Sequence, residues 1–510
     1  MRSLAVLFIL ALSASTTQAQ DVLVLASKEF QPALKGWLQH RKAQGHEIAV
    51  RAPTDDIRAL VREVHEESGQ KLRFVLLLGD VQHVPCAYVP AVIIRQWDRA
   101  TRIATDNPYA DLDDDEMPDL AIGRLPADSV EEARSMLERV VAFEQNADLG
   151  SWRRKLNIIT GTGGYGQMAD LALEMLARQF LKDHIPPAYE VTLTYAKPDS
   201  PFCAPPAEFA DTVIERINEG ALVVAYVGHG NSETVDTFLH GPKRYPIFNL
   251  DHVESVATRK GPPLMVFVAC STGKYDTGRD CLAELVLKQP RGPIGVIASS
   301  RVSTPYSNGI LAKEVMDQLF IARAPTAGEL LMQAKRRLME PREGDKQREL
   351  LEKMAGSFYE KSAQKRADDR AEHLHLYQLF GDPCMRIPYP EPLELEIPDQ
   401  VVAGRGLRFA GRAPFPGTLE LELVAARDIA FTRPRRKKQT DEDFRRVYDA
   451  ANNRTVARTA LRVEAGAFEG MLQVPEDLAP GTYIARIFAA GKKSTAVGGK
   501  RIKVVEKKKE

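Results

Sequence analysis

The chain has 510 residues, and its 69 Lys and Arg residues equal its 69 Asp and Glu residues in number. This length predicts about three domains with sizeable hydrophobic cores. The balanced charge excludes a general attraction to nucleic acid or to an anionic membrane, so we expect neither as a partner.

The first 19 residues have the pattern of a signal peptide. Arg2 precedes an apolar stretch from Leu4 to Leu12, and small and polar residues lead to Ala19. The apolar stretch is too short to cross a bilayer, and no later stretch is long and apolar enough to be a transmembrane segment. We expect residues 1–19 to be removed and the protein to be exported and soluble, whether secreted, at the cell surface or periplasmic.

Strand-like and helix-like segments alternate from residue 20 to about residue 389. Stretches starting at Ser129 and Thr326 predict helices with capped first turns. The alternation favours an α/β fold with parallel strands, divided into an N-terminal subdomain over 20–152 and a catalytic subdomain over 153–389. The apolar runs that predict strands are 22–26, 72–78, 156–159, 221–227, 264–269 and 294–298.

The pattern changes after residue 389. Polar and apolar residues alternate over 393–397 and 419–423, which predicts an all-β sandwich over 391–506, followed by a basic tail over 507–510. Residues 342–370 carry many charges and few apolar positions, so we interpret them as a solvated helix or loop. The basic cluster 433–438 and the acidic residues 441–443 are interpreted as a solvated turn.

Two of the predicted strands lead to reactive side chains. The run 221–227 is followed by His229, and the run 264–269 is followed by Cys270. If the strands are neighbours, both side chains emerge at the carboxyl edge of one sheet, where open α/β folds place their active sites. A thiol beside an imidazole there indicates a nucleophile with its base. The N–H groups of Gly230 and Cys270 are the candidate donors for an oxyanion.

The other cysteines carry no such context. Five cysteines imply no dense disulfide framework, and an odd number leaves at least one thiol free unless it pairs between chains. A lone cysteine is usually a small buried hydrophobe, and Cys281 in an apparent helix is interpreted in this way.

The segments 226–234 (YVGHGNSET) and 263–270 (PLMVFVAC) resemble the catalytic His and Cys segments of the gingipains, peptidase family C25. Segments 75–80, 122–126, 297–300 and 379–383 extend the resemblance over about residues 21–389. The resemblance implies caspase-like parallel or mixed sheets flanked by helices in two subdomains, followed by an immunoglobulin-like sandwich. It also implies a cysteine endopeptidase with nucleophile Cys270, base His229 and an oxyanion hole at Gly230 and Cys270. Its substrate would be a protein or peptide, and catalysis would need no cofactor.

Two positions depart from the family's pattern. Gingipains place a Glu beside the catalytic His, just before a Gly-Gly pair, whereas Thr162 precedes Gly163-Gly164 here. Thr162 is therefore the candidate partner of the imidazole, although it cannot stabilise the charge. Asp170 lies near the place of the acidic residue that selects basic side chains, but it also suits a helix cap. Cleavage after basic residues is the corresponding expectation.

Asp111, Asp113, Asp115 and Asp119 form a possible cation site. Alternating carboxylates in a compact loop suit Ca²⁺, which takes several oxygen ligands. Glu116 stands where a turn-forming Gly would be expected, and an acidic solvated loop is the alternative.

Two other functions remain open at this point. In a transpeptidase or sortase-like processing enzyme, an amine would replace water at the acyl-enzyme. Without a Glu beside His229, the chain could also be a catalytically weak secreted binding protein that recognises its partner with the sandwich.

Overall fold

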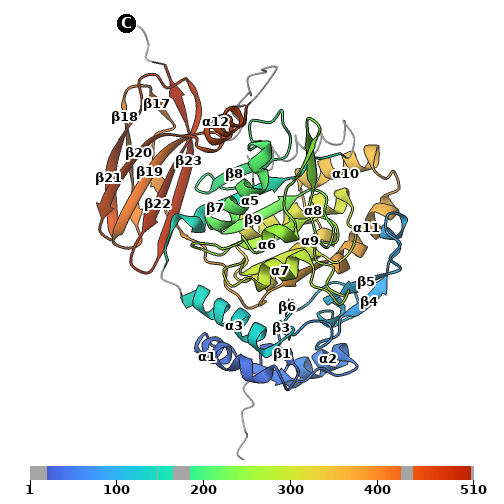
Figure 1. Ribbon diagram of the computed structural model, residues 1–510. Coiled ribbons are helices and arrows are strands. Elements are labelled where there is room, and N and C mark those ends of the chain that lie inside the picture. The colour runs from blue at the N-terminus through green and yellow to red at the C-terminus, as the bar shows by residue number, and fades with distance from the viewer. Residues whose placement is uncertain (1–19, 146–147, 165–183, 427–439, 507–510) are drawn as a thin grey trace, which may run out of the picture.

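The computed structural model describes residues 20–145, 148–164, 184–426 and 440–506 (Figure 1). The predicted signal peptide, Asp170, the basic cluster 433–438 and the basic tail lie outside these residues. One continuous ten-stranded sheet runs through both predicted α/β subdomains. Its strands in spatial order are β2 (Ile48–Arg51), β1 (Val22–Ala26), β3 (Phe74–Leu78), β6 (Ala121–Leu125), β14 (Tyr377–Phe380), β13 (Gly295–Ser299), β12 (Leu264–Val268), β9 (Val223–Val227), β7 (Lys155–Thr160) and β8 (Glu190–Tyr195).

The sheet consists of two parallel halves that run in opposite directions. Strands β2, β1, β3, β6 and β14 are mutually parallel, and so are β13, β12, β9, β7 and β8. The halves meet where β13 pairs antiparallel with β14. Because β14 comes late in the chain yet pairs with β6, the two subdomains share one sheet.

Helices cover both faces of this sheet (Figure 1). In β9, Val224 and Tyr226 belong to a core cluster with residues of α5 and α7, whereas Val223 and Ala225 belong to a cluster with residues of α8 and α9. This alternation is expected of strands buried on both faces. The helices are α1 (Lys35–Ala43), α2 (Ile57–Glu67), α3 (Val130–Gln145), α5 (Phe209–Asn218), α6 (Leu250–Val253), α7 (Leu282–Lys288), α8 (Pro305–Asp317), α9 (Ala327–Met339), α10 (Lys346–Phe358) and α11 (Ala363–Leu376). Among the described residues, no helix is both long and apolar enough to span a membrane.

Two antiparallel hairpins extend from the loops of the sheet. The strands β4 (Ala87–Pro90) and β5 (Arg102–Thr105) form one between β3 and β6. The strands β10 (Thr237–His240) and β11 (Lys243–Pro246) form the other after β9.

The predicted C-terminal sandwich is confirmed as two packed sheets around their own hydrophobic core. The larger sheet has the order β15-β23-β22-β19-β20, with β17 also paired to β23, and the smaller has the order β16-β18-β21. The strands are β15 (Glu391–Pro392), β16 (Leu395–Glu396), β17 (Gln400–Val402), β18 (Gly406–Ala413), β19 (Gly417–Ala425), β20 (Thr455–Val463), β21 (Gly466–Gln473), β22 (Gly481–Ala490) and β23 (Thr495–Val505).

The sandwich carries a helix that the sequence analysis did not predict. Residues 441–443, interpreted above as part of a solvated turn, are the first turn of α12 (Asp441–Asn452), and Thr440 caps it. The helix lies between the sandwich and the large sheet (Figure 1). Asn452 accepts a hydrogen bond from the Leu193 amide at 2.8 Å and donates one to the Leu193 carbonyl at 3.1 Å. Its side chain thus pairs with the edge strand β8 as a neighbouring strand would.

The charged stretch 342–370 forms α10 and most of α11. Both helices begin with a side-chain cap, at Asp345 and at Ser362. The interpretation as purely solvated is wrong for part of the stretch, because Arg348 and Asp369 are buried. Arg348 pairs with Glu352 within α10 and donates to the Leu338 carbonyl of α9. Asp369 accepts from the Thr304 hydroxyl before α8. The contacts with other helices are long-range, and a sequence pattern does not reveal them.

Candidate active site

His229 and Cys270 occupy equivalent positions just after the ends of two neighbouring parallel strands. Val227 at the end of β9 pairs with Val268 at the end of β12, and each reactive residue comes two positions later. The Gly228 amide donates to the Val268 carbonyl at 3.2 Å, which extends the pairing to the residue before His229. The register of the sheet therefore brings the two residues together at its carboxyl edge, as the apolar runs predict.

Cys270 is half-buried, and its sulfur forms hydrogen bonds with Ser303. The Ser303 amide donates to Sγ at 3.3 Å, and the Ser303 hydroxyl lies 3.8 Å from Sγ. In its thiol form Sγ donates to the Ser303 carbonyl at 3.4 Å. The backbone turns sharply after the cysteine, since Ser271 has a φ of 52° and its amide donates to the Arg301 carbonyl at 2.9 Å.

The four other cysteines are free thiols in more buried or less reactive settings. Burial raises the pKa of the Cys281 and Cys384 thiols well above the ordinary value. Burial, together with the nearby Asp106, raises the pKa of Cys86 to about 11. Cys203 is fully buried. Cys270 is therefore the thiol best placed to react, because thiolate character and access decide reactivity.

The His229 ring is exposed, and its Nε2 lies 2.9 Å from the Gly163 carbonyl. A carbonyl only accepts hydrogen bonds, so Nε2 carries the proton and Nδ1 is the basic ring nitrogen. Thr162, which the resemblance places beside the imidazole, is one residue away from that contact. Its hydroxyl and amide donate instead to Asp236, at 3.3 and 3.0 Å.

Asp236 and Tyr226 hold the loop that carries His229, and neither role was predicted from the sequence. Oδ2 of Asp236 accepts from the His229 amide at 3.4 Å as well as from Thr162, which joins the loops after β7 and β9. The buried Tyr226 hydroxyl donates to the His229 carbonyl at 2.9 Å and accepts from the Asp236 amide at 3.1 Å. A Cβ at Gly161 would lie 2.1 Å from Oδ2, so this junction needs a glycine.

The two predicted oxyanion donors are backbone amides at the ends of the loops that carry His229 and Cys270. Among the described residues, neither the Gly230 nor the Cys270 amide has a hydrogen-bond acceptor. Gly230 packs tightly against the cysteine segment, because a Cβ there would lie 2.8 Å from Thr272 Cγ2 and 3.1 Å from the Cys270 carbonyl oxygen. The amides therefore have the freedom that an oxyanion hole requires.

The acidic loop brings together three of its four predicted ligands. Carboxylate oxygens of Asp111, Asp113 and Asp115 lie within 4.8 Å of one another. Desolvation raises the pKa of Asp115, as do the neighbouring carboxylates. Glu116 adopts a φ of 68°, which is the left-handed conformation expected of the missing Gly. Asp119 lies outside the cluster and pairs with Arg336 at 3.1 Å.

Comparison with known proteins agrees with these features. The sequence model of peptidase family C25 matches residues 15–388. Gingipain R2 of Porphyromonas gingivalis is 21% identical over 396 residues, which cover 74% of this chain and 47% of that protein. Lys-gingipain of the same organism is 21% identical over 296 residues, covering 55% of this chain and 15% of that protein. The chain thus matches less than half of the length of these curated relatives.

The fold is shared with a solved gingipain over nearly the whole chain. The crystal structure of the Arg-specific cysteine proteinase gingipain R has a TM-score of 0.55 and 18% identity, and the match covers 96% of this chain and 99% of that one. The complex of the pro- and mature domains of the Porphyromonas gingivalis protein RgpB has a TM-score of 0.53, with 17% identity. The sandwich lies within the aligned region, which agrees with the α/β plus immunoglobulin-like architecture.

Proposed function

The chain belongs to peptidase family C25, and from this premise we propose that it is a cysteine endopeptidase acting on protein or peptide substrates. The proposal rests on the register of β9 and β12, because His229 and Cys270 occupy equivalent positions after the ends of these paired parallel strands. Its proposed catalytic residues are Cys270 as nucleophile, His229 as base, and the Gly230 and Cys270 amides as oxyanion donors.

The contacts of His229 support its proposed part in the reaction. Because Nε2 donates to Gly163, Nδ1 takes the thiol proton of Cys270. The sulfur then attacks the peptide carbonyl, and the oxygen that gains the negative charge binds to the two amides. Nδ1 gives its proton to the leaving amine as the C–N bond breaks. Water, deprotonated by His229, hydrolyses the thioester and regenerates the thiol.

Asp236 gives the loop of His229 a nearby negative charge in place of the family's Glu. Its carboxylate accepts from the backbone of His229 and from Thr162, so it fixes the imidazole through the main chain. We propose Asp236 as a positioning residue and Thr162 as its anchor in the loop after β7. Asp236→Asn keeps the shape but removes the charge, and a fall in kcat with little change in KM would support this role.

Digestion of a peptide library by the full chain tests the activity. We expect internal cleavage that disappears in Cys270→Ala and persists in Cys281→Ala. Cleavage that survives Cys270→Ala would contradict the proposal. No cleavage of any peptide would favour the binding-protein alternative. Product masses that include an added amine nucleophile would identify a transpeptidase instead.

We propose cleavage after basic residues as the specificity, because the related proteins are named for Arg and Lys. Asp170 would supply the carboxylate that pairs with the substrate's first side chain. The library digest reports this preference directly, and Asp170→Asn should lower kcat/KM for Arg and Lys peptides only. An equal loss for all peptides would assign Asp170 to a structural role such as a helix cap.

We further propose that the acidic loop binds Ca²⁺ through Asp111, Asp113 and Asp115. The convergence of their oxygens and the turn at Glu116 support this site. Arg58 also pairs with Asp111 at 2.7 Å and competes for one of its oxygens. Calcium should raise the melting temperature of the parent but not of an Asp113→Ala, Asp115→Ala variant. A parent that does not respond to calcium would contradict the site.

We propose export as the destination, on the signal-peptide pattern of residues 1–19. N-terminal sequencing of the protein from culture fractions tests it. A mature chain that starts near residue 20 outside the cytoplasm is expected, and a chain that keeps Arg2 in the cytoplasm would contradict it.

A further inference from the structure

A chain of buried hydrogen bonds leads from the core of the protein to the sulfur of Cys270. The Tyr377 hydroxyl donates to Oδ1 of Asn308 at 2.7 Å, and Nδ2 of Asn308 donates to the Ser303 hydroxyl at 2.8 Å. The Ser303 hydroxyl in turn lies 3.8 Å from Sγ. The three side chains are 1%, 8% and 5% exposed, so water does not compete for these bonds.

The donors and acceptors of these hydrogen bonds follow one direction, from Tyr377 toward the sulfur. An amide nitrogen can only donate, so the bond from Asn308 occupies a lone pair of the Ser303 oxygen and leaves its hydrogen for another acceptor. In the described part of the structure, Sγ of Cys270 is the acceptor that this hydroxyl reaches, at 3.8 Å. Each bond polarises the next, and the positive end of the chain points at the sulfur.

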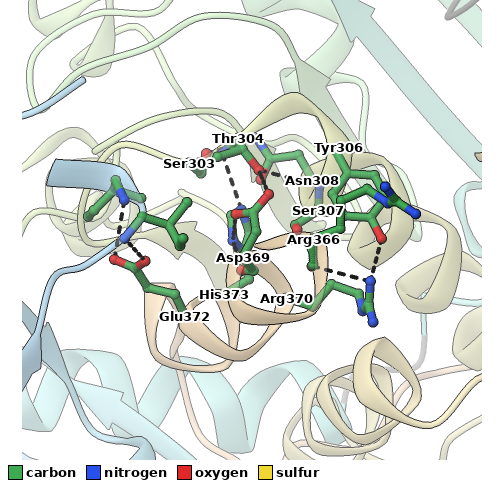
Figure 2. A network of polar contacts seen from close by, with 12 residues as sticks. Ser303, Thr304, Tyr306, Ser307, Asn308, Arg366, Asp369, Arg370, Glu372 and His373 are labelled. Carbon is green, nitrogen blue, oxygen red and sulfur yellow. Dashed lines mark hydrogen bonds and ion pairs between the residues drawn. The ribbon is translucent and has the colours of Figure 1, made fainter. Parts of the chain in front are cut away.

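A second set of contacts fixes the backbone of the same segment. The amide of Thr304 donates to Nε2 of His373 at 3.2 Å, and the Thr304 hydroxyl donates to Asp369 at 2.7 Å. Figure 2 shows Ser303 and Thr304 beside these residues of α11 and beside Asn308 of α8. Because α11 holds Thr304 at both its amide and its hydroxyl, the Ser303 amide keeps its position 3.3 Å from Sγ.

We propose that Ser303 is a catalytic residue that stabilises the thiolate of Cys270 through its hydroxyl and its amide, with Asn308 and Tyr377 as positioning residues that direct the hydroxyl. The inference rests on the proposed function, in which Cys270 is the nucleophile. When Sγ gives its proton to His229, the contact with the Ser303 carbonyl loses its hydrogen and the two donors hold the negative sulfur. When the sulfur forms its bond to the substrate carbonyl, the charge passes to the carbonyl oxygen and these two bonds weaken.

The pH dependence of alkylation tests the inference without a substrate. Iodoacetamide reacts with thiolates, and mass spectrometry of the digested full chain reports the modification of Cys270 separately from that of the other cysteines. In Ser303→Ala the midpoint of the alkylation profile should move up by about one pH unit, because a hydrogen bond to a charged group is lost.

Two further variants test the direction of this series of hydrogen bonds. In Asn308→Asp a carboxylate takes the hydrogen of the Ser303 hydroxyl away from the sulfur, so the midpoint should also rise. In Tyr377→Phe the remaining bonds stay, so the shift should be in the same direction but smaller. Thermal melting shows which variants fold. If Asn308→Asp does not fold, Tyr377→Phe is the variant to use, because it removes only one oxygen.

Matched controls separate this role from general disturbance of the core. The Ser300 hydroxyl is buried and donates to the Ala104 carbonyl at 2.7 Å, and the Tyr306 hydroxyl donates to Glu352 at 2.6 Å. Ser300→Ala and Tyr306→Phe should leave the midpoint unchanged. A folded Ser303→Ala with the parent's midpoint would overturn the inference, and so would an equal shift in Ser300→Ala. If the parent cleaves no peptide while the shifts occur, the proposed function fails but the stabilisation of the thiolate stands.

Discussion

Two regions surround the segment that contacts the sulfur of Cys270, and they are built in opposite ways. One is the pair of loops that carry His229 and Cys270, and the other is helix α11, which holds Thr304. The reactive groups are exposed or half-buried and rest on strands whose side chains are almost all buried. In α11, Asp369 and His373 are buried and paired on several sides. Reactive groups need access to substrate, whereas the groups that support them need fixed partners. Substitutions in the first region should therefore reduce activity, and those in the second should reduce stability.

Gly230→Ala tests most strongly whether substitutions near His229 and Cys270 reduce activity. The new Cβ would push against Thr272 and displace an oxyanion donor, so kcat should fall about 10²- to 10³-fold. The melting temperature should change far less. Gly36→Ala is the matched control, because a Cβ there meets nothing within 4 Å. Steady-state kinetics that match the parent in Gly230→Ala would remove Gly230 from the oxyanion hole.

Asp369→Ala tests whether substitutions in the buried network of α11 reduce stability. It leaves the Thr304 hydroxyl without its acceptor and removes the carboxylate that lies 3.2 Å from Nδ1 of His373, which then keeps the backbone carbonyl of residue 369, so the free energy of unfolding should fall by about 3 kcal/mol. Urea unfolding measures this loss. Asp368→Ala, at an exposed neighbouring position, should change it by less than about 0.5 kcal/mol. If both variants unfold alike, the buried network does not support the fold.

The same carboxylate should give the stability a particular dependence on pH. Burial alone would raise the pKa of Asp369, but His373 and the hydrogen bonds outweigh it, so the pKa is lowered. A lowered pKa stabilises the native state above the unfolded-state pKa of about 3.9, and this contribution disappears as the pH falls through the native value. The difference in unfolding free energy between the parent and Asp369→Asn should thus be constant above about pH 5 and shrink in more acidic solution. A difference that grows on acidification would contradict the assignment.

Apart from the control variants, Tyr306→Phe should have the smallest effect. Its hydroxyl joins Glu352 to Arg370 between α8, α10 and α11, so its loss should lower the unfolding free energy by about 1 kcal/mol. Peptidase kinetics should stay within about twofold of the parent, because the group lies outside the chain of bonds that reaches Cys270. A large loss of activity would show that the network of α11 controls the site more directly than its contacts indicate.

The contrast also explains which features could be predicted from the sequence. The strands before His229 and Cys270 are short apolar runs, and the parallel pairing of such runs places their ends together. Asp236 was missed because its role depends on a contact between two loops that are 74 residues apart. The hydrogen bonds near the sulfur were missed because single polar residues in apolar surroundings carry no periodic signal. These residues are Ser303, Asn308 and Tyr377. The helix α12 was missed because charged residues dominate its first turn.

Labelling by a peptidyl acyloxymethyl ketone, followed by mass spectrometry of the modified peptide, is the decisive test of the proposed pair of Cys270 and His229. A series of traps with different first residues would cover the unknown specificity. We expect one covalent adduct on Cys270 of the parent and its loss in His229→Ala, while melting shows that the variant stays folded. Labelling of Cys281 instead, or an undiminished adduct on Cys270 in His229→Ala, would contradict the pairing of thiol and imidazole on which the account depends.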